Sequence, residues 1–526
     1  MRAIGGPSVM RGEPLLLGLD LGTSALKVLL VALDGRIVGR ASAGYPIERP
    51  GPDRAEQHPE AWWHALVAGV GQALASVRTA DPGAPDPASR IAAIGLSGQM
   101  HGTVLLGGDL RPLGPAIIWP DQRSSRQVEA LTAEVGRERL IDIVGGPLAT
   151  GFQAATARWL REEEPARWAE MRMVLTPKDA LRLRLTGELA TDPSDGSGTG
   201  LLDVTTRRWS DEILAAVELE LDRLPPLRDA SASAGTLLPE PAAALGLPTG
   251  IPVATGAADT PAGLLGAGVI APDVFFLSIS TGGQLAVPAT EPTVDHLGRT
   301  HTFCAALAPS AATAGWYRLA ATLSAGMALR WLRDAVFALD TPDAFDRMVA
   351  WAEDVPIGAR GLVFLPYLTG ERSPHMDPTA RGVFLGLTAR HGQAELVRAV
   401  LEGVTLACFD ASRVLAGAHA LPDRFVLAGG GARSPLWQQI VSDVFGAPLR
   451  RLEVDEQAAV GACLLAGAAV DMIDPATASR AWARLGPVVE PDEARHVRYL
   501  ELLELFRDAY AANRAAFTSL RRFEAG

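Results

Sequence analysis

The chain has 526 residues, 48% hydrophobic and 21% charged, and its formal net charge is −12. This length exceeds what one hydrophobic core usually serves, so we expect at least two domains. The acidic balance without Lys/Arg runs argues against a nucleic-acid partner, and no run of 18 apolar residues predicts a membrane span.

The first third of the sequence predicts an α/β domain. We expect residues 1–14 to be a disordered lead without the apolar core of a signal peptide. Residues 15–47 read as three antiparallel strands with turns at Gly22-Thr23-Ser24 and Asp34-Gly35. A helix over 61–77 follows, since its apolar residues share one face. Residues 91–98 form an apolar strand that runs into Gln99-Met100-His101.

The second part of the chain repeats the pattern of the first. Pro and Gly residues over 238–250 predict a boundary, which gives domains at 15–250 and 251–526. Residues 274–288 read as strand, Ser-Thr-Gly-Gly turn and strand, which matches the first hairpin. Residues 424–446 read as a strand, three glycines and an amphipathic helix. A closing helix is expected around 499–510.

The three cysteines, Cys304, Cys408 and Cys463, are far apart and show no CxxC spacing. This spacing disfavours a disulfide framework or a zinc site and predicts a reducing, cytoplasmic environment. His301 to Cys304 is better explained as a strand with a buried cysteine than as a metal ligand pair.

Three turns rich in small residues, each at the end of an apolar strand, favour a phosphate-rich ligand. Glycine lets the backbone approach closely, and N–H groups and a threonine hydroxyl can donate to phosphate oxygens. A Walker loop is excluded because neither lysine, Lys27 or Lys178, follows glycine. The sequence also contains neither a strand leading into G-x-G-x-x-G nor a G-x-S-x-G elbow.

Two acidic residues precede such small-residue segments. Asp20 could form an Asx turn, or it could face a phosphate through Mg²⁺. Asp259 could cap a helix that has Pro261 in its first turn, or it could act as a general base. The residues alone favour the Asx turn for Asp20 and leave the two roles of Asp259 open.

Several motifs together resemble one family. These are "LGLDLGTSALKVLL", "GLSGQMHG", "GAADTPAG", "LSISTGG", "LAGGGARSPLWQQIVSDVFG" and the stretch Gly382–Glu402. They are similar to the FGGY carbohydrate kinases, and within that family to the xylulokinases, over about residues 15–467. The resemblance implies an α/β fold of two actin-like ATPase (ribonuclease H-like) domains with a cleft between them. It also implies ATP-dependent phosphorylation of a ketopentose, with D-xylulose giving D-xylulose 5-phosphate.

The resemblance also implies roles for individual residues. Asp259 would be the catalytic base, and Asp20 would sit near Mg²⁺. The sugar would meet Gln99, Met100, His101, Asp259 and Thr260. ATP would meet the two phosphate turns at Thr23, Ser24, Ser280, Thr281, Gly282 and Gly283, with Trp331, Gly430, Gly431 and Ser434 beside the adenosine.

The sequence departs from the family pattern at several positions. Ala258-Asp259-Thr260 replaces Gly-Asp-Asn, and Ile279-Ser280-Thr281-Gly282 replaces Leu-Gly-Thr-Ser. Trp119-Pro120-Asp121 replaces Trp-Asn-Asp, and Thr156 stands where the family has lysine. These changes lie in sugar and phosphate motifs, so the substrate is less firmly predicted than the family.

Three other functions stay open at this point. The chain could be a kinase of the same fold for another ketose or polyol, although Gln-Met-His-Gly differs from the Gln-Arg-Glu element of glycerol kinases. It could be a non-catalytic sugar or nucleotide sensor, or an actin- or chaperone-like ATPase. The expected partners are the small-molecule sugar and ATP, and whether the chain forms a homodimer cannot be read from the sequence.

Overall fold

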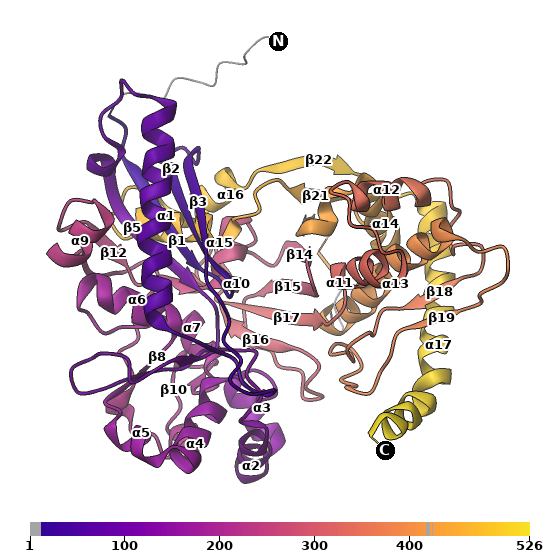
Figure 1. Cartoon of the computed structure of the whole chain (residues 1–526), viewed down its shortest axis with the longest axis horizontal. Helices are drawn as coiled ribbons and strands as arrows, with labels where there is room; N and C mark the ends of the chain where they lie inside the picture. Colours follow the sequence, from indigo (N-terminus) through magenta and orange to yellow (C-terminus); the bar gives the residue numbers. More distant parts are fainter. Residues whose placement is uncertain (1–11, 417–420, 423, 526) are drawn as a thin grey trace.

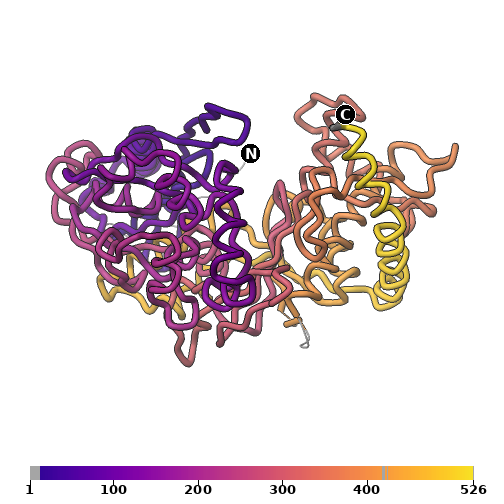
Figure 2. Tube along the Cα trace, turned by 90° about the horizontal axis from the view of Figure 1, so that it is seen from below, coloured from indigo at the N-terminus to yellow at the C-terminus, as the bar shows by residue number. Residues whose placement is uncertain are grey.

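The computed structural model describes residues 12–416, 421–422 and 424–525. The predicted disordered lead at 1–14 falls mostly on residues outside these ranges. The described chain forms two lobes, one built from the earlier part of the sequence and one from the later part (Figure 1). The lobes are joined along one side and lie apart on the other (Figure 2).

The sheet of the first lobe has the strand order β11-β12-β5-β1-β2-β3, and β13 also pairs with β5. Its strands are β1 Leu15–Leu21, β2 Ala25–Ala32, β3 Ile37–Gly44, β5 Ile91–Gly98, β11 Ser233–Thr236, β12 Pro252–Ala254 and β13 Ala257–Ala258. The three predicted antiparallel strands are confirmed, because β2 pairs antiparallel with both β1 and β3. β5, β12 and β13 extend this sheet in parallel with β1.

The sheet of the second lobe has the order β16-β17-β15-β14-β20-β21-β22. Its strands are β14 Val274–Ile279, β15 Gly283–Ala289, β16 His301–Cys304, β17 Trp316–Thr322, β20 Arg424–Ala428, β21 Leu449–Leu452 and β22 Leu485–Val489. β14 pairs antiparallel with β15 and parallel with β20, as β1 pairs with β2 and β5. The predicted duplication is therefore present in the topology of the two mixed sheets.

Helices cover both sheets. In the first lobe they are α1 Pro59–Ala80, α2 Ser125–Val135, α3 Arg137–Val144, α4 Gln153–Glu163, α5 Pro165–Glu170, α6 Pro177–Thr186, α7 Pro193–Gly198, α8 Asp211–Val217, α9 Pro239–Leu245 and α10 Asp259–Gly266. Later in the chain come α11 Gly326–Trp331, α12 Ala344–Ala352, α13 Gln393–Ala416, α14 Pro435–Phe445, α15 Gln457–Ala468, α16 Pro475–Trp482 and α17 Glu493–Ala525. The closing helix is α17, which buries Tyr499, Leu503, Phe506 and Tyr510 in the second lobe.

Short strands outside the two sheets are β4 Glu56–Gln57, β6 Val104–Leu106, β7 Ala116–Ile117, β8 Met173–Leu175, β9 Leu202–Asp203, β10 Arg208–Trp209, β18 Val363–Leu365 and β19 Val383–Leu385. The interrupted run of residues 91–106 is thus β5, a turn and β6. No helix of the described residues is long and apolar enough to cross a membrane.

The first sheet extends past the predicted boundary at residue 250, because β12 and β13 both pair with β5. The Pro and Gly residues that suggested the boundary belong instead to α9, which starts with Pro239 and is capped by Gly246 in a left-handed conformation. Later in the chain, α15 returns to cover β1 and β5 (Figure 1).

The packing of α15 on the first sheet depends on close backbone contact. A Cβ atom on Gly95 of β5 would lie 1.9 Å from the carbonyl oxygen of Ala462. A Cβ atom on Gly461 of α15 would lie 2.0 Å from the carbonyl oxygen of Ala262 in α10. Glycine is required at both positions because only glycine allows two backbones to approach so closely.

Candidate active site

The two predicted acidic residues meet at one edge of the first sheet. Asp20 in β1 pairs with Ser97 of β5, and Ser97 pairs with Ala257 of β13, so the three residues form one row across the strands. Neighbouring strands lie about 4.8 Å apart. Asp259 directly follows β13, so it lies beside the end of β5. The carboxyl ends of parallel strands are where α/β sheets place their ligand sites.

Asp20 is almost fully buried at this edge. The Ser97 hydroxyl donates to its Oδ1 at 2.8 Å. Burial raises the pKa of Asp20, while the charge of Lys27 and the hydrogen bond from Ser97 act in the opposite direction. The side chain accepts a hydrogen bond from β5, and the Asx turn that the residues alone favoured is not formed.

Asp259 is the first residue of α10, and Ala258 occupies the cap position before it. Its Oδ1 accepts a hydrogen bond from the backbone N–H of Thr260 at 2.7 Å. Burial and, next in size, the negative charge of Asp20 raise the pKa of Asp259 to about 7. A carboxyl group with a pKa near neutral can exchange a proton with a substrate hydroxyl at physiological pH.

The first predicted phosphate turn is braced from behind. The Trp119 indole donates to Thr23 Oγ1 at 2.9 Å, and Gln57 Nε2 donates to the Thr23 carbonyl at 2.7 Å. Gln99 is fully buried, and its Nε2 donates to Gln57 Oε1 at 2.9 Å. The structure thus places Gln99 behind the turn, whereas Ser24 is exposed at its tip.

Met100 and His101 lie where the two lobes meet. The hydroxyl of Tyr317, from the second lobe, lies 3.9 Å from Met100 Sδ. The His101 ring stacks on Phe152 with 4.1 Å between centroids and 9° between planes. His101 Nδ1 also contacts the carbonyl oxygen of Gly198, the last residue of α7.

His101 is held in its neutral form. Its pKa is lowered to about 4, mainly by burial and further by the nearby charges of His301 and Arg372. Because Nδ1 faces a carbonyl oxygen, Nδ1 must carry the hydrogen and Nε2 is left as an acceptor. The φ angle of 73° at His101 lies in the left-handed region, which turns the chain sharply after β5.

The second and third small-residue turns lie side by side. Ser280 and Thr281 are exposed, and Gly282 accepts a hydrogen bond from the Ser280 N–H at 3.0 Å. β14 and β20 end together, since Ser278 pairs with Ala428. A Cβ atom on Gly431 would lie 2.5 Å from Ile279 Cγ2, so the turn at Gly429–Ser434 packs directly on the turn after β14.

Other predicted nucleotide residues have structural partners of their own. Gly283 is buried at the start of β15, while Gly430 is exposed. Ser434 caps α14 by accepting from the Trp437 N–H. The ring of Trp331 stacks on Phe364 at 6.4 Å.

Sequence reasoning missed the supports of this site. Phe152, Gly198 and Tyr317 contact His101 or Met100 from distant parts of the chain, so no local pattern indicates them. Thr156 is buried within α4, and its hydroxyl has no hydrogen-bond partner among the described residues. The HxxC segment is β16, and Cys304 is fully buried there, as predicted.

Two α/β lobes, each with a mixed β-sheet of the same topology and small-residue turns at the strand ends, define the actin-like ATPase fold. The chain belongs to the FGGY family of carbohydrate kinases. Residues 15–266 match the model of the N-terminal domain of this family, and residues 278–470 match that of its C-terminal domain. Kinases of this family use ATP.

Xylulose kinases are among the similar proteins. The chain is 37% identical to the xylulose kinase of Escherichia coli strain K12 over 94% of this chain and 98% of that protein. The crystal structure of a xyloylose kinase from Brucella ovis is similar with a TM-score of 0.86 and 36% identity, covering 95% of this chain and 100% of the other. The crystal structure of gluconate kinase from Lactobacillus acidophilus gives a TM-score of 0.87 at 25% identity, with 97% of this chain and 100% of that chain covered.

Proposed function

We propose that this protein transfers the γ-phosphoryl group of ATP to a ketopentose, converting D-xylulose into D-xylulose 5-phosphate. The observation that carries the proposal is Asp259, whose pKa is raised to about 7 beside the second carboxylate, Asp20. Similarity to xylulose kinases over nearly the whole chain supports the choice of sugar.

In the proposed reaction a sugar hydroxyl attacks the γ-phosphorus in line. The hydroxyl proton moves to Asp259, a new O–P bond forms, and the bond from phosphorus to the bridging oxygen of ADP breaks. Phosphoryl transfer depends chiefly on positioning and charge neutralisation, with one carboxylate accepting the proton. Asp259 is suited to this because its pKa lets it be both deprotonated and basic near neutral pH.

Asp20 is our candidate for holding Mg²⁺. No group of three or more His, Cys, Asp or Glu residues in the described part of the chain could hold a metal ion. A single carboxylate is nevertheless sufficient for Mg²⁺, which keeps several waters and takes further oxygens from phosphates. Bound there, the ion would neutralise phosphate charge.

The turns would divide the nucleotide between them. Thr23 and Ser24 on one lobe, and Ser280, Thr281, Gly282 and Gly283 on the other, would donate to phosphate oxygens. Gly430, Gly431 and Ser434 would lie beside the adenosine, with Trp331 as a further contact. The packing of Gly431 on Ile279 supports this, because it keeps the two turns of the second lobe adjacent.

Sugar recognition would centre on His101, with Met100 and Thr260 alongside and Gln99 behind them. The free Nε2 of neutral His101 can accept a hydrogen bond from a sugar hydroxyl. We expect His101→Ala to raise KM for the sugar about 5- to 150-fold and to leave KM for ATP within about threefold, because a lost hydrogen bond in a buried site costs about 1–3 kcal/mol.

The decisive experiment measures ADP release with a panel of pentuloses, hexuloses, polyols and gluconate. We expect the highest kcat/KM with D-xylulose. Asp259→Asn should lower kcat by about 10²- to 10⁴-fold, the usual contribution of a general base. Equal ADP release with and without sugar would overturn the kinase proposal, whereas preference for another sugar would overturn only the substrate.

Gluconate is the second candidate substrate. Arg372 is exposed, makes no ion pair among the described residues, and lies close enough to His101 and His301 for its charge to lower the pKa of both. A free guanidinium beside the sugar residues suits a carboxylate-bearing substrate. If gluconate is the substrate, Arg372→Gln should reduce its kcat/KM far more than that of D-xylulose.

The cytoplasmic location stays a prediction. Sedimentation of the purified protein would show whether the chain forms a homodimer.

A further inference from the structure

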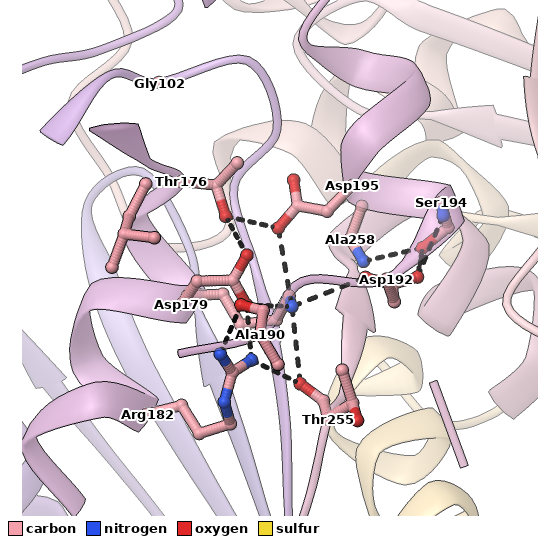
Figure 3. Close-up of polar contacts among 12 residues, drawn as sticks. Gly102, Thr176, Asp179, Arg182, Ala190, Asp192, Ser194, Asp195, Thr255 and Ala258 are labelled. Atoms are coloured by element: carbon pink, nitrogen blue, oxygen red, sulfur yellow. Dashed lines mark hydrogen bonds and ion pairs between the residues drawn. The ribbon is translucent and has the colours of Figure 1, made fainter. Parts of the chain in front are cut away.

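A group of charged residues with no assigned role lies directly behind the candidate sugar site. It consists of Lys178, Asp179, Arg182, Asp192 and Asp195, which we call the buried charge cluster. All five side chains are fully buried. Figure 3 shows how Asp179 and Arg182 on α6 face Asp192 and Asp195 at the start of α7.

The cluster is closely connected by ion pairs. Lys178 Nζ lies 2.6 Å from Asp179 Oδ1, 3.4 Å from Asp192 Oδ1 and 3.6 Å from Asp195 Oδ2. Arg182 Nη1 lies 2.5 Å from Asp179 Oδ1 and donates to the Thr255 carbonyl at 3.0 Å. Three carboxylates thus face two cations, which would leave one negative charge uncompensated, at a large cost in a buried site.

The hydrogen bonds show where this imbalance is resolved. Thr176 Oγ1 lies 2.9 Å from Asp179 Oδ2 and 2.7 Å from Asp195 Oδ2. A hydroxyl has one hydrogen to donate, so a carboxyl proton must supply one of these two contacts. Asp179 is paired with both cations, whereas Asp195 Oδ1 has no hydrogen-bond partner in the described chain. The proton therefore belongs on Asp195, and burial raises the pKa of Asp195 well above its usual value.

The cluster is linked to both ends of the proposed sugar site through α7. Asp192 accepts from the N–H and hydroxyl of Ser194, and Ser194 Oγ in turn accepts from the N–H of Ala258 at 3.1 Å. Ala258 is the residue before Asp259. At the other end of α7, the Gly198 carbonyl contacts His101 Nδ1.

We propose that Asp195 is held as a neutral carboxylic acid, which balances the charge of the cluster, and that the cluster positions Asp259 and His101 through α7. Its members are positioning residues, since none of them touches the proposed reacting atoms. The inference rests on the roles proposed above for Asp259 and His101, although it does not depend on which sugar is phosphorylated.

Asparagine substitutions distinguish the protonated Asp195 from the ionised Asp192. Asparagine resembles a protonated aspartic acid, because its amide can donate to Thr176 as the acid does. We expect Asp195→Asn to keep kcat/KM for the best sugar within about threefold. The matched variant Asp192→Asn removes a charged partner of Lys178 and disturbs the Ser194 link, so kcat/KM for the sugar should fall by about a hundredfold, as a small misplacement of reacting groups can cause. Equal losses in the two variants would overturn the assignment of the proton.

Ser194→Ala keeps the charges and removes the hydroxyl that joins Asp192 to the N–H of Ala258, so it tests positioning even if Asp192→Asn does not fold. We expect kcat/KM for the sugar to fall about tenfold while KM for ATP changes by less than threefold. Equal effects on sugar and ATP parameters would show that the cluster is only structural.

An infrared difference spectrum tests the proton without any assay of activity. At pH 8 the wild-type protein should show a carboxylic acid C=O band that is missing in Asp195→Asn. Finding no such band would overturn the inference. Because this readout needs no substrate, its outcome is independent of the sugar panel, which tests the proposed function.

Discussion

In the first lobe, the hairpin of β1 and β2 pairs Asp20 with Lys27, whereas in the second lobe the hairpin of β14 and β15 pairs Ser278 with Gln284. The two hairpins have the same strand neighbours, yet a carboxylate–lysine pair in one is replaced by two neutral side chains in the other. The duplicated backbone has therefore kept its turns and differs in its charge. We infer that the first lobe neutralises phosphate charge and accepts the proton, and that the second lobe binds the phosphates with uncharged groups.

The groups that hydrogen-bond to the two turns also differ. Around the first turn, Gln57 and Trp119 fix Thr23, and Tyr45 donates to the Gly22 carbonyl. Around the second turn, Thr281 is exposed, and its carbonyl accepts from the backbone N–H of Ala325 at 3.0 Å. The first turn is thus braced by side chains, which suits the proposed site for a metal and a base, whereas the second is held by backbone N–H groups of residues 325–327.

The largest difference in kcat between variants of the two lobes should appear when the polar side chain before each turn is replaced. Asp20→Asn should lower kcat by at least about a hundredfold, because a preorganised group that stabilises charge in the transition state is lost. Ser278→Ala should change kcat by less than about threefold, since its hydroxyl bonds only to that of Ser280 at 3.1 Å. Steady-state kinetics at saturating ATP measures both, and similar losses would contradict the division of roles.

The pH dependence of sugar phosphorylation should show an effect of Asp20 on Asp259. Asp259 must be deprotonated to act as a base, so kcat/KM should rise with pH through a midpoint near 7, the value to which its pKa is raised. The negative charge of Asp20 contributes to the raised pKa of Asp259, and Asp20→Asn removes this charge. The pKa of Asp259 then falls, and the midpoint should move to lower pH in the residual activity of this variant. A midpoint that stayed in place or moved upward would show that the two carboxyl groups do not interact.

Much of the fold could be predicted from the sequence because local patterns determine it. Alternating apolar residues and short turns identified β1, β2 and β3, and the repeated Gly/Thr hairpin indicated the duplication. The end of the first sheet was harder to predict, because Pro239 and Gly246 read equally well as an interdomain boundary and as the two ends of a short helix.

The site was predictable only in part. Asp20 lies near the end of β1, and His101 and Asp259 follow strands, so their positions at the sheet edge could be expected. Their supports could not, because Phe152 and Gly198 approach His101 through tertiary contacts. The buried charge cluster was also missed, because Lys178, Asp179 and Arg182 resemble a solvated helix face in sequence, and Asp192 and Asp195 meet them only through the tertiary fold.

The smallest effect should come from Ser280, where the family pattern has glycine. Ser280 is not among the residues with positive φ, so serine is accommodated here without backbone strain. Ser280→Gly should therefore leave kcat unchanged and alter KM for ATP by less than about threefold, the loss of one exposed hydroxyl contact. Gly22→Ser makes the reverse exchange in the first lobe, where an added Cβ atom would lie 3.1 Å from the Ala25 carbonyl oxygen. That variant should raise KM for ATP more than Ser280→Gly does, because the braced first turn has less room to adjust; equal effects would show that both turns are equally adaptable.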